Sequence, residues 1–307
     1  MSKDVKNQHY IPQFYLKRFT GENGRFCVYS ILDNKYLCRQ QPRNFGASRY
    51  FYDVQKAELI ELMEEIASVN PCIKSEIDYD DEQLIEHYLS RSEADAKNVF
   101  DLIDEDYNAL FSEEIQQKLI IFLHDLSSRT EFLRKYYSYI NNNLIHHLEK
   151  MGVPKSKMPV DNAKMTQLHD MFDMGSLYKT ANMLKNNYDW FVGNNLSELN
   201  FITSDNPVFG VFLGFNDICF PISKKKSIIF RAKNNGGYLI SDDVSSDGKT
   251  IDLSVKSVLI YNEMLILNAY RYAFGDKNTF DEIDLIRQFL KQGERPKRCF
   301  QNYKGLF

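Results

Sequence analysis

Three short segments carry side chains suited to acid–base chemistry and anion binding. His9 lies in NQHYIPQFYLKRF, Arg129 in SSRTEFLR and Asp205 in FITSDNPV. A His side chain changes its charge near neutral pH and can therefore transfer a proton. An Asp can orient that His or bind a metal ion, and an Arg can hold an anionic group. Together these three side chains suit a hydrolase or a nuclease-like protein that acts on a phosphate-containing substrate.

Three further polar side chains lie next to these candidates, and we expect them to contact the substrate: Gln13, Ser204 and Asn206. Ser204 and Asn206 follow an apolar stretch that predicts a strand, and a rigid strand is a common way to position a site. Pro207 excludes helical geometry at Asn206, so the segment must turn there.

The same residues also fit a structural interpretation, in which the protein is a non-catalytic binding or regulatory module. Asp205 would then accept hydrogen bonds from the backbone N–H groups that follow it, as in an Asx-turn. Arg129 would form a salt bridge with Asp205, and His9 would pack near a sheet and bond a carbonyl group. In this alternative the His/Arg/Asp cluster is a structural clasp.

Motifs for cofactors and metals are absent from the sequence. It contains no GxGxxG, no GxxxxGK[ST], no HExxH and no GxSxG, so the nucleotide, zinc and serine-hydrolase classes that these motifs define lack support. His169 and Asp173 are spaced to share a metal ion on one helix face, but no third ligand adjoins them, and an exposed polar face is the favoured interpretation. Any cofactor or metal is therefore unknown at this stage.

Composition sets limits on partners and compartment. The chain has 307 residues and a formal net charge of −4 at pH 7, which gives no global basic footprint for nucleic acid. No apolar run reaches the roughly 18 residues of a membrane span, and no secretory signal is visible at the start. The five cysteines are scattered and form no CxxC pair, which predicts no disulfide framework and a reducing cytoplasm. The partner and the oligomeric state are not identified.

Periodicity predicts the elements that must position these residues. Residues 25–31 and 35–40 alternate around an Asp-Asn turn and predict a β-hairpin, while His9 to Ile11 form an extended approach to a short helix that begins at Pro12. Apolar positions at helical spacing predict helices over about 57–69, 80–110, 113–148 and 162–188. Ser112 can cap the third helix, which we expect to be bent or split near Ser127 and Ser128.

Strand-like segments lie at both ends of the chain, with the helices between them. We therefore predict an α+β fold, with a mixed or antiparallel sheet built from the N- and C-terminal thirds. The helical region, about 56–190, would be inserted between the sheet-forming segments 1–55 and 199–275. No linker is long enough to force a domain boundary, so we expect residues 1–307 to form a single domain.

Several of these segments resemble an uncharacterised, largely bacterial family known as a domain of unknown function, number four-two-three-eight. The resemblance covers most of the chain, and its most specific parts are the His-Tyr-x-Pro-x-x-Tyr-Leu opening and the Thr-Ser-Asp-Asn-Pro-Val turn. The family carries no established reaction. The resemblance implies that His9, Arg129, Asp205 and Asn206 belong to one constellation, and the bacterial hosts suggest an effector of phage defence.

One departure from the family pattern falls beside Arg129. The family often has Arg-Thr-Pro where this chain has Arg129-Thr130-Glu131. Because proline kinks or breaks a helix, its loss predicts a helix that is less kinked at this point.

Overall fold

A computed structural model describes residues 6–69, 78, 80–81, 83–158, 162–208, 217–233 and 242–290. The helices are α1 (Gln13–Lys17), α2 (Lys56–Val69), α3 (Leu84–Glu105), α4 (Glu113–Ser128), α5 (Glu131–Lys150), α6 (Ala163–Phe172), α7 (Met174–Asn187), α8 (Val255–Asn268) and α9 (Lys277–Leu290). The strands are β1 (Asn7–His9), β2 (Phe26–Ser30), β3 (Lys35–Gln40), β4 (Ala47–Arg49), β5 (Tyr188–Asn195), β6 (Thr203–Ser204), β7 (Asp217–Pro221), β8 (Lys226–Ala232), β9 (Thr250–Leu253) and β10 (Tyr272–Gly275).

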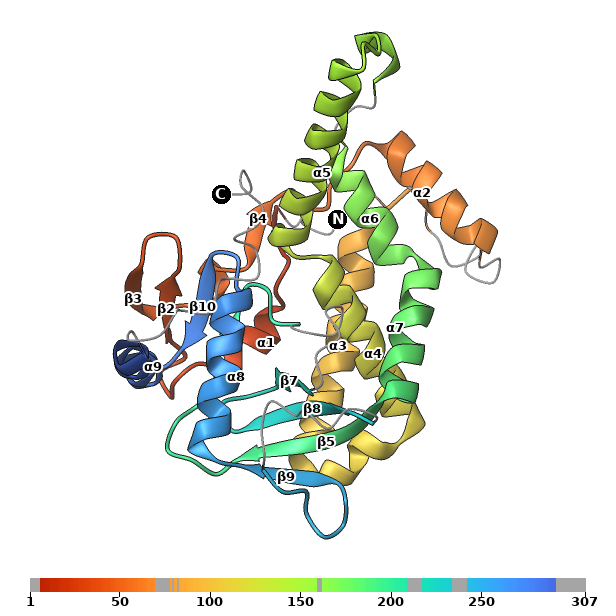
Figure 1. Cartoon of the computed structure of the whole chain (residues 1–307). Helices are drawn as coiled ribbons and strands as arrows, with labels where there is room; N and C mark the ends of the chain where they lie inside the picture. The colour runs from red at the N-terminus through yellow and green to blue at the C-terminus, as the bar shows by residue number, and fades with distance from the viewer. Residues whose placement is uncertain are drawn as a thin grey trace.

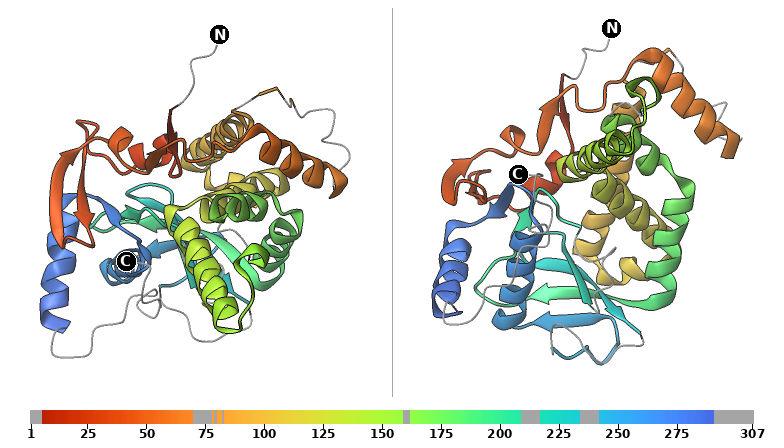
Figure 2. Two further views of the ribbon diagram at one scale, coloured as in Figure 1. Left: turned by 90° about the horizontal axis from the view of Figure 1, so that it is seen from above. Right: turned by 45° about the horizontal axis from the view of Figure 1, so that its top comes forward.

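The fold is α+β, as predicted, and its strands form separate sheets. The predicted hairpin β2–β3 is confirmed, and β10 and β6 extend it into a four-stranded antiparallel sheet. The N- and C-terminal thirds therefore meet in one sheet. A second sheet has the order β7-β8-β5-β9, with β9 parallel to β5 (Figure 1). The hairpin and α9 lie on the opposite side of the molecule from α2 (Figure 2).

The predicted helix over residues 113–148 is split, and the split positions Arg129. Helix α4 ends at Ser128 and α5 begins at Glu131, and α5 projects away from the two sheets in Figure 1. Thr130 caps α5, because its side-chain oxygen accepts a hydrogen bond from the backbone N–H of Leu133 at 3.2 Å. The split lies close to the predicted break at Ser127 and Ser128, while the expectation that this region is less kinked than in relatives with the proline stays a prediction. Ser112 caps α4 as predicted.

The predicted helix over residues 162–188 is two helices. Asp173 separates α6 from α7, and its carboxylate accepts hydrogen bonds from the backbone N–H groups of Gly175 and Ser176. Two acceptors at one N-terminus satisfy donors that would otherwise need water. Periodicity alone did not reveal this break, because the apolar positions continue on both sides of it.

The predicted extended approach to a short helix is confirmed only at His9, the last residue of β1, because Tyr10 and Ile11 form a bend before α1. Strand β1 pairs with β4, which places His9 opposite Ala47. The carbonyl of Gly46 then accepts the backbone N–H groups of Tyr10 and Ile11 at 2.8 and 3.0 Å. Gly46 has a φ of +66°, and a Cβ there would lie 2.7 Å from Cβ of Ile11. Both the left-handed backbone and the close approach of Ile11 therefore require glycine at this position. This tight turn fixes the backbone that carries His9.

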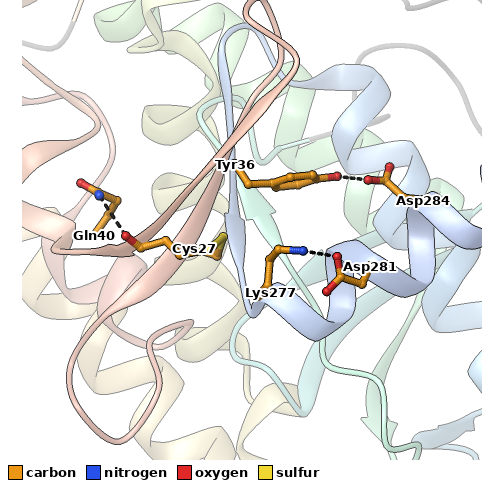
Figure 3. Close-up of a disulfide and its surroundings, with 7 residues drawn as sticks. Cys27, Tyr36, Gln40, Lys277, Asp281 and Asp284 are labelled. Carbon is orange, nitrogen blue, oxygen red and sulfur yellow. Dashed lines mark hydrogen bonds and ion pairs between the residues drawn. A yellow bond between two sulfur atoms is a disulfide. The ribbon is translucent and has the colours of Figure 1, made fainter.

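The prediction that the cysteines form no disulfide was wrong for one pair. Cys27 on β2 and Cys38 on β3 are bonded, with their Cα atoms 4.0 Å apart. Figure 3 shows this disulfide near two contacts that involve α9, a hydrogen bond from Tyr36 to Asp284 and an ion pair of Lys277 with Asp281. Strand pairing brings the two cysteines together, which their spacing in the sequence does not show.

The disulfide bears on the compartment. Disulfides persist mainly in oxidising environments, so the cysteines no longer support the prediction of a reducing cytoplasm. Cys219 is a free, buried thiol, while Cys72 and Cys299 lie outside the described residues. Within the described ranges, no helix combines the length and the apolar character that crossing a bilayer requires.

Candidate functional site

Asp205 follows β6 and lies in a fully paired environment. Its side chain is 2% exposed. One carboxylate oxygen accepts the backbone N–H of Tyr270 at 2.8 Å, and the other accepts those of Arg271 and Tyr272 at 2.7 and 3.1 Å. Burial raises the pKa of Asp205 to about 7, and the three backbone bonds act in the opposite direction. Asp205 therefore ties β6 to the segment that leads into β10.

Asn206 and Ser204 extend this structural role. The side-chain amide of Asn206 donates to the carbonyl of Asn268 at 3.2 Å, and the amide of Asn268 donates to the carbonyl of Asn206 at 2.8 Å. The hydroxyl of Ser204 accepts the backbone N–H of Asn206 at 3.2 Å. We call residues 204–206 with their partners in 268–272 the Asp205 turn. The predicted Asx-turn is replaced by bonds to residues more than 60 positions away.

Gln13 lies at the first position of α1. Its side-chain amide donates to the carbonyl of Pro42 at 3.1 Å, which connects α1 to the 3-10 turn of residues 42–44. The predicted role of Gln13, Ser204 and Asn206 in binding a substrate stays a prediction, but each already contacts other parts of the chain.

Arg129 lies at the junction of α4 and α5 and is 1% exposed. Its Nη1 group pairs with Oε1 of Glu93 on α3 at 2.9 Å. This pair takes the place of the predicted salt bridge with Asp205. The Nε and Nη2 groups of Arg129 are buried and have no hydrogen-bond partner among the described residues. These two N–H groups share one edge of the guanidinium, the edge that binds carboxylate and phosphate oxygens in pairs.

His9 is half-buried and lies in the electrostatic field of Arg129. Burial lowers the pKa of His9, the positive charge of Arg129 lowers it further, and a hydrogen bond to the backbone of Arg43 raises it. The ring is therefore uncharged at neutral pH. Its Nε2 atom is buried without a partner in the described part of the chain. A neutral ring held by a backbone carbonyl at one nitrogen presents a lone pair at the other.

Glu86 and Glu93 are the residues that sequence reasoning missed. They are seven residues apart on α3, which is about two helical turns, so they share one face. Burial raises the pKa of Glu86 to about 7, the negative charge of Glu93 raises it further, and Arg129 lowers it. Oε2 of Glu86 is buried without a partner among the residues described. The sequence did carry a signal for these two acids, because both lie beside Leu89 on the face of α3 that is otherwise apolar and buried.

Tyr52 completes the group, which we call the His9–Arg129 cluster (His9, Tyr52, Glu86, Glu93 and Arg129). The hydroxyl of Tyr52 donates to the backbone carbonyl of His9 at 3.3 Å. Burial raises the pKa of Tyr52, and the charges of Arg129, Glu86 and Glu93 all act on it. The side chain of Glu93 is 25% exposed, so the cluster reaches the surface. Strand β1, helix α3 and the α4–α5 junction thus bring together an acid, a base and an anion-binding edge.

His169 and Asp173, the sequence candidates for a metal site, have other partners. Nδ1 of His169 lies 3.3 Å from Oε2 of Glu65, and Asp173 caps α7. Across the described ranges, no group of three His, Cys, Asp or Glu side chains is placed to hold a metal ion.

The fold and the cluster define an α+β protein with a helical middle segment and a partly buried group of ionisable side chains that includes His9 of its N-terminal strand. The chain belongs to the family described as a protein of unknown function, DUF4238, whose model matches residues 7–279. The resemblance seen in the sequence is thereby confirmed. No curated protein and no solved structure matches the chain.

Proposed function

We propose that this protein is a hydrolase of a phosphate-containing substrate and that the His9–Arg129 cluster is its active site. One observation carries the proposal. The Nε–Nη2 edge of Arg129 is buried and has no partner among the described residues, and it suits two oxygens of a phosphate group. Leaving such donors unpaired costs about 1–3 kcal/mol each, and a bound oxyanion would recover that cost.

The neighbouring groups supply the proton transfers. Glu93 holds the guanidinium of Arg129 from the opposite side. Nε2 of His9 accepts a proton from a water molecule whose oxygen forms the new bond to phosphorus. The bond from phosphorus to the leaving oxygen breaks, and Glu86, which carries a proton below about pH 7, donates it to that oxygen. Two groups with opposite pKa shifts are a common arrangement for acid and base.

Asp205 takes no part in this scheme. The sequence suggested it as the group that orients His9, but both of its oxygens accept backbone N–H groups. In the scheme the backbone of Arg43 orients the imidazole. The narrower proposal of a nuclease-like effector in bacterial phage defence rests on the family resemblance.

The test uses the purified full-length chain with three probes: bis-p-nitrophenyl phosphate, p-nitrophenyl phosphate and an end-labelled single-stranded RNA. We expect hydrolysis of at least one of them. His9→Gln should lower kcat by about 10²–10⁴-fold, and Arg129→Lys should raise KM because lysine lacks the two-donor edge. His147→Gln, on the exposed side of α5, is the matched control and should keep the full rate. An unchanged rate in His9→Gln would refute the assignment.

A second candidate is a non-catalytic binding or regulatory module, and the Asp205 turn favours it. Both oxygens of Asp205 and the side chain of Asn206 bond the chain itself, which is what a structural clasp requires. This candidate predicts that His9 is also structural, so that His9→Ala lowers the thermal unfolding temperature. A folded His9→Ala variant that has lost hydrolysis supports the enzyme instead.

A further inference from the structure

A cleft of about 580 Å³ lies at the beginnings of α5 and α6, and its charged lining is mostly cationic. Its lining includes four cationic side chains and one carboxylate, that of Glu131; the cations are Arg134, Lys135, Lys164 and Arg271. The members of the His9–Arg129 cluster are not among its lining residues. The cleft is therefore distinct from that cluster.

The carboxylate in the cleft is already compensated. Both oxygens of Glu131 lie 3.3–3.4 Å from Nη1 of Arg271, and Oε2 also accepts the hydroxyl of Tyr10 at 3.1 Å. This arrangement pairs one cation with the one carboxylate. Arg134, Lys135 and Lys164 remain as the cations that a ligand can use.

Arg134 is held by several contacts, and one of its nitrogens has no partner among the described residues. Its Nε donates to Oε1 of Gln167 and its Nη1 to the carbonyl of Phe51, both at 2.7 Å. The guanidinium lies 3.6 Å above the ring centre of Phe51, a cation–π geometry that fixes its plane. Nη2 is buried without a partner within the described residues. Burial lowers the pKa of Arg134 to about 10, so the group is still charged at pH 7.

Lys164 is held in a similar way on the neighbouring helix. Its Nζ donates to the carbonyls of Asp53 and Tyr50 at 2.6 and 3.1 Å, which leaves one of its three N–H groups available. Burial lowers the pKa of Lys164, the positive charge of Arg134 lowers it further, and the carboxylates of Asp53 and Glu58 raise it. Arg134 and Lys164 thus repel each other, and an anion between them would relieve that repulsion.

We propose that this cleft binds a small phosphorylated ligand of two or more negative charges, through Arg134, Lys135 and Lys164. The volume suits a small molecule, and phosphate oxygens match the forked donors of arginine and the point charges of lysine. The rings of Phe45 and Tyr272 line the same cleft and give the remainder of the ligand an aromatic wall. This site is separate from the proposed active site.

The test is isothermal titration of the full-length chain with inorganic pyrophosphate at low and at physiological salt. We expect saturable binding that weakens as salt rises. Lys135→Glu reverses the charge of an exposed side chain in the cleft and should lower the affinity by about tenfold or more, which is the effect of losing roughly 1.4 kcal/mol. Lys179→Glu makes the same change on the exposed face of α7 and should have little effect.

Two further outcomes keep this proposal separate from the proposed hydrolase. Arg134→Gln, if folded by circular dichroism, should also lose pyrophosphate binding, whereas His9→Gln should retain it. Absence of pyrophosphate binding, or equal losses in Lys135→Glu and Lys179→Glu, would overturn the cleft site. Loss of binding in His9→Gln would show that the cleft and the His9–Arg129 cluster are not separate sites. A failed hydrolysis assay leaves all of these outcomes unaffected.

Discussion

The Asp205 turn and the His9–Arg129 cluster are both polar and at least partly buried, yet they differ in how their polar atoms are paired. Both oxygens of Asp205 accept backbone N–H groups. In the cluster, Nε2 of His9, Oε2 of Glu86 and two nitrogens of Arg129 are buried without partners among the described residues. The two regions thus differ in the pairing of their polar atoms, and this difference supports the proposal that the cluster, and not the Asp205 turn, is the active site.

The physical reason lies in what each arrangement does to the folded state. A buried donor or acceptor without a partner costs free energy, so a chain that needed only stability would pair or remove it. The Asp205 turn does pair its groups and joins two segments that are distant in sequence. The cluster retains unpaired buried groups, which fits the proposal that it binds a ligand.

The largest expected effect comes from removing the acceptor at the centre of the paired region. Asp205→Ala leaves the backbone N–H groups of Tyr270, Arg271 and Tyr272 without their acceptor. We expect a loss of about 3 kcal/mol or more in the free energy of unfolding, measured by urea titration. Should the variant lose less than about 1 kcal/mol, the Asp205 turn is not a clasp.

A smaller effect tests the turn that carries His9. Gly46→Ala places a Cβ 2.7 Å from Cβ of Ile11 at a φ of +66°. We expect a loss of about 2 kcal/mol from left-handed strain and crowding, together with a lower rate of hydrolysis because His9 is displaced. Gly24 has a φ of +67°, and a Cβ added there would meet no atom within 4 Å. Gly24→Ala is therefore the matched control, because it has the backbone strain of a positive φ without the crowding. Equal losses in the two variants would mean that Gly46 does not position the strand by close approach.

Asn206→Ala tests the Asp205 turn by a smaller change that should leave the protein folded. It removes the amide that donates to Asn268 but keeps the backbone carbonyl that accepts in return. We expect a loss of about 1–2 kcal/mol in urea unfolding, with hydrolysis unchanged. A variant that keeps its stability and loses hydrolysis would move Asn206 into the active site.

The last prediction concerns how stability depends on pH. Glu86 has a pKa of about 7 in the folded protein against an ordinary value of 4.5, so the folded state binds more protons between those values. Its contribution to stability is present below pH 4.5 and is lost as pH rises to about 7. Glu86→Gln removes this loss, so its stability relative to the unmodified protein should rise from pH 5 to pH 7.5 in thermal unfolding. A difference that stays constant across this range would contradict the shift.

The local elements were predictable, because they depend on neighbours in the sequence. The β2–β3 hairpin, the Ser112 cap and the extended segment at His9 follow from alternation, capping chemistry and proline geometry. The break in the helix beside Arg129 was predicted within a few residues. These features need no knowledge of what packs against them.

The pairing of the site residues was not predictable to the same degree. Whether Asp205 bonds the next residues or a segment more than 60 positions away depends on where β6 and β10 meet. Glu86 and Glu93 fall on the apolar face of α3, but the sequence does not show that Arg129, at the end of α4, lies against that face. The Cys27–Cys38 bond likewise depends on strand register, which spacing alone does not fix.

The central claim is that the His9–Arg129 cluster is kept for function and the Asp205 turn for stability. Urea unfolding of His9→Gln beside Asp205→Ala tests it most directly. The account predicts that His9→Gln loses no more than about 1 kcal/mol, because Nε2 has no partner among the described residues and the ring has a single hydrogen bond, to the backbone of Arg43, while Asp205→Ala loses about 3 kcal/mol. A loss in His9→Gln as large as that in Asp205→Ala would make both regions structural and contradict the claim.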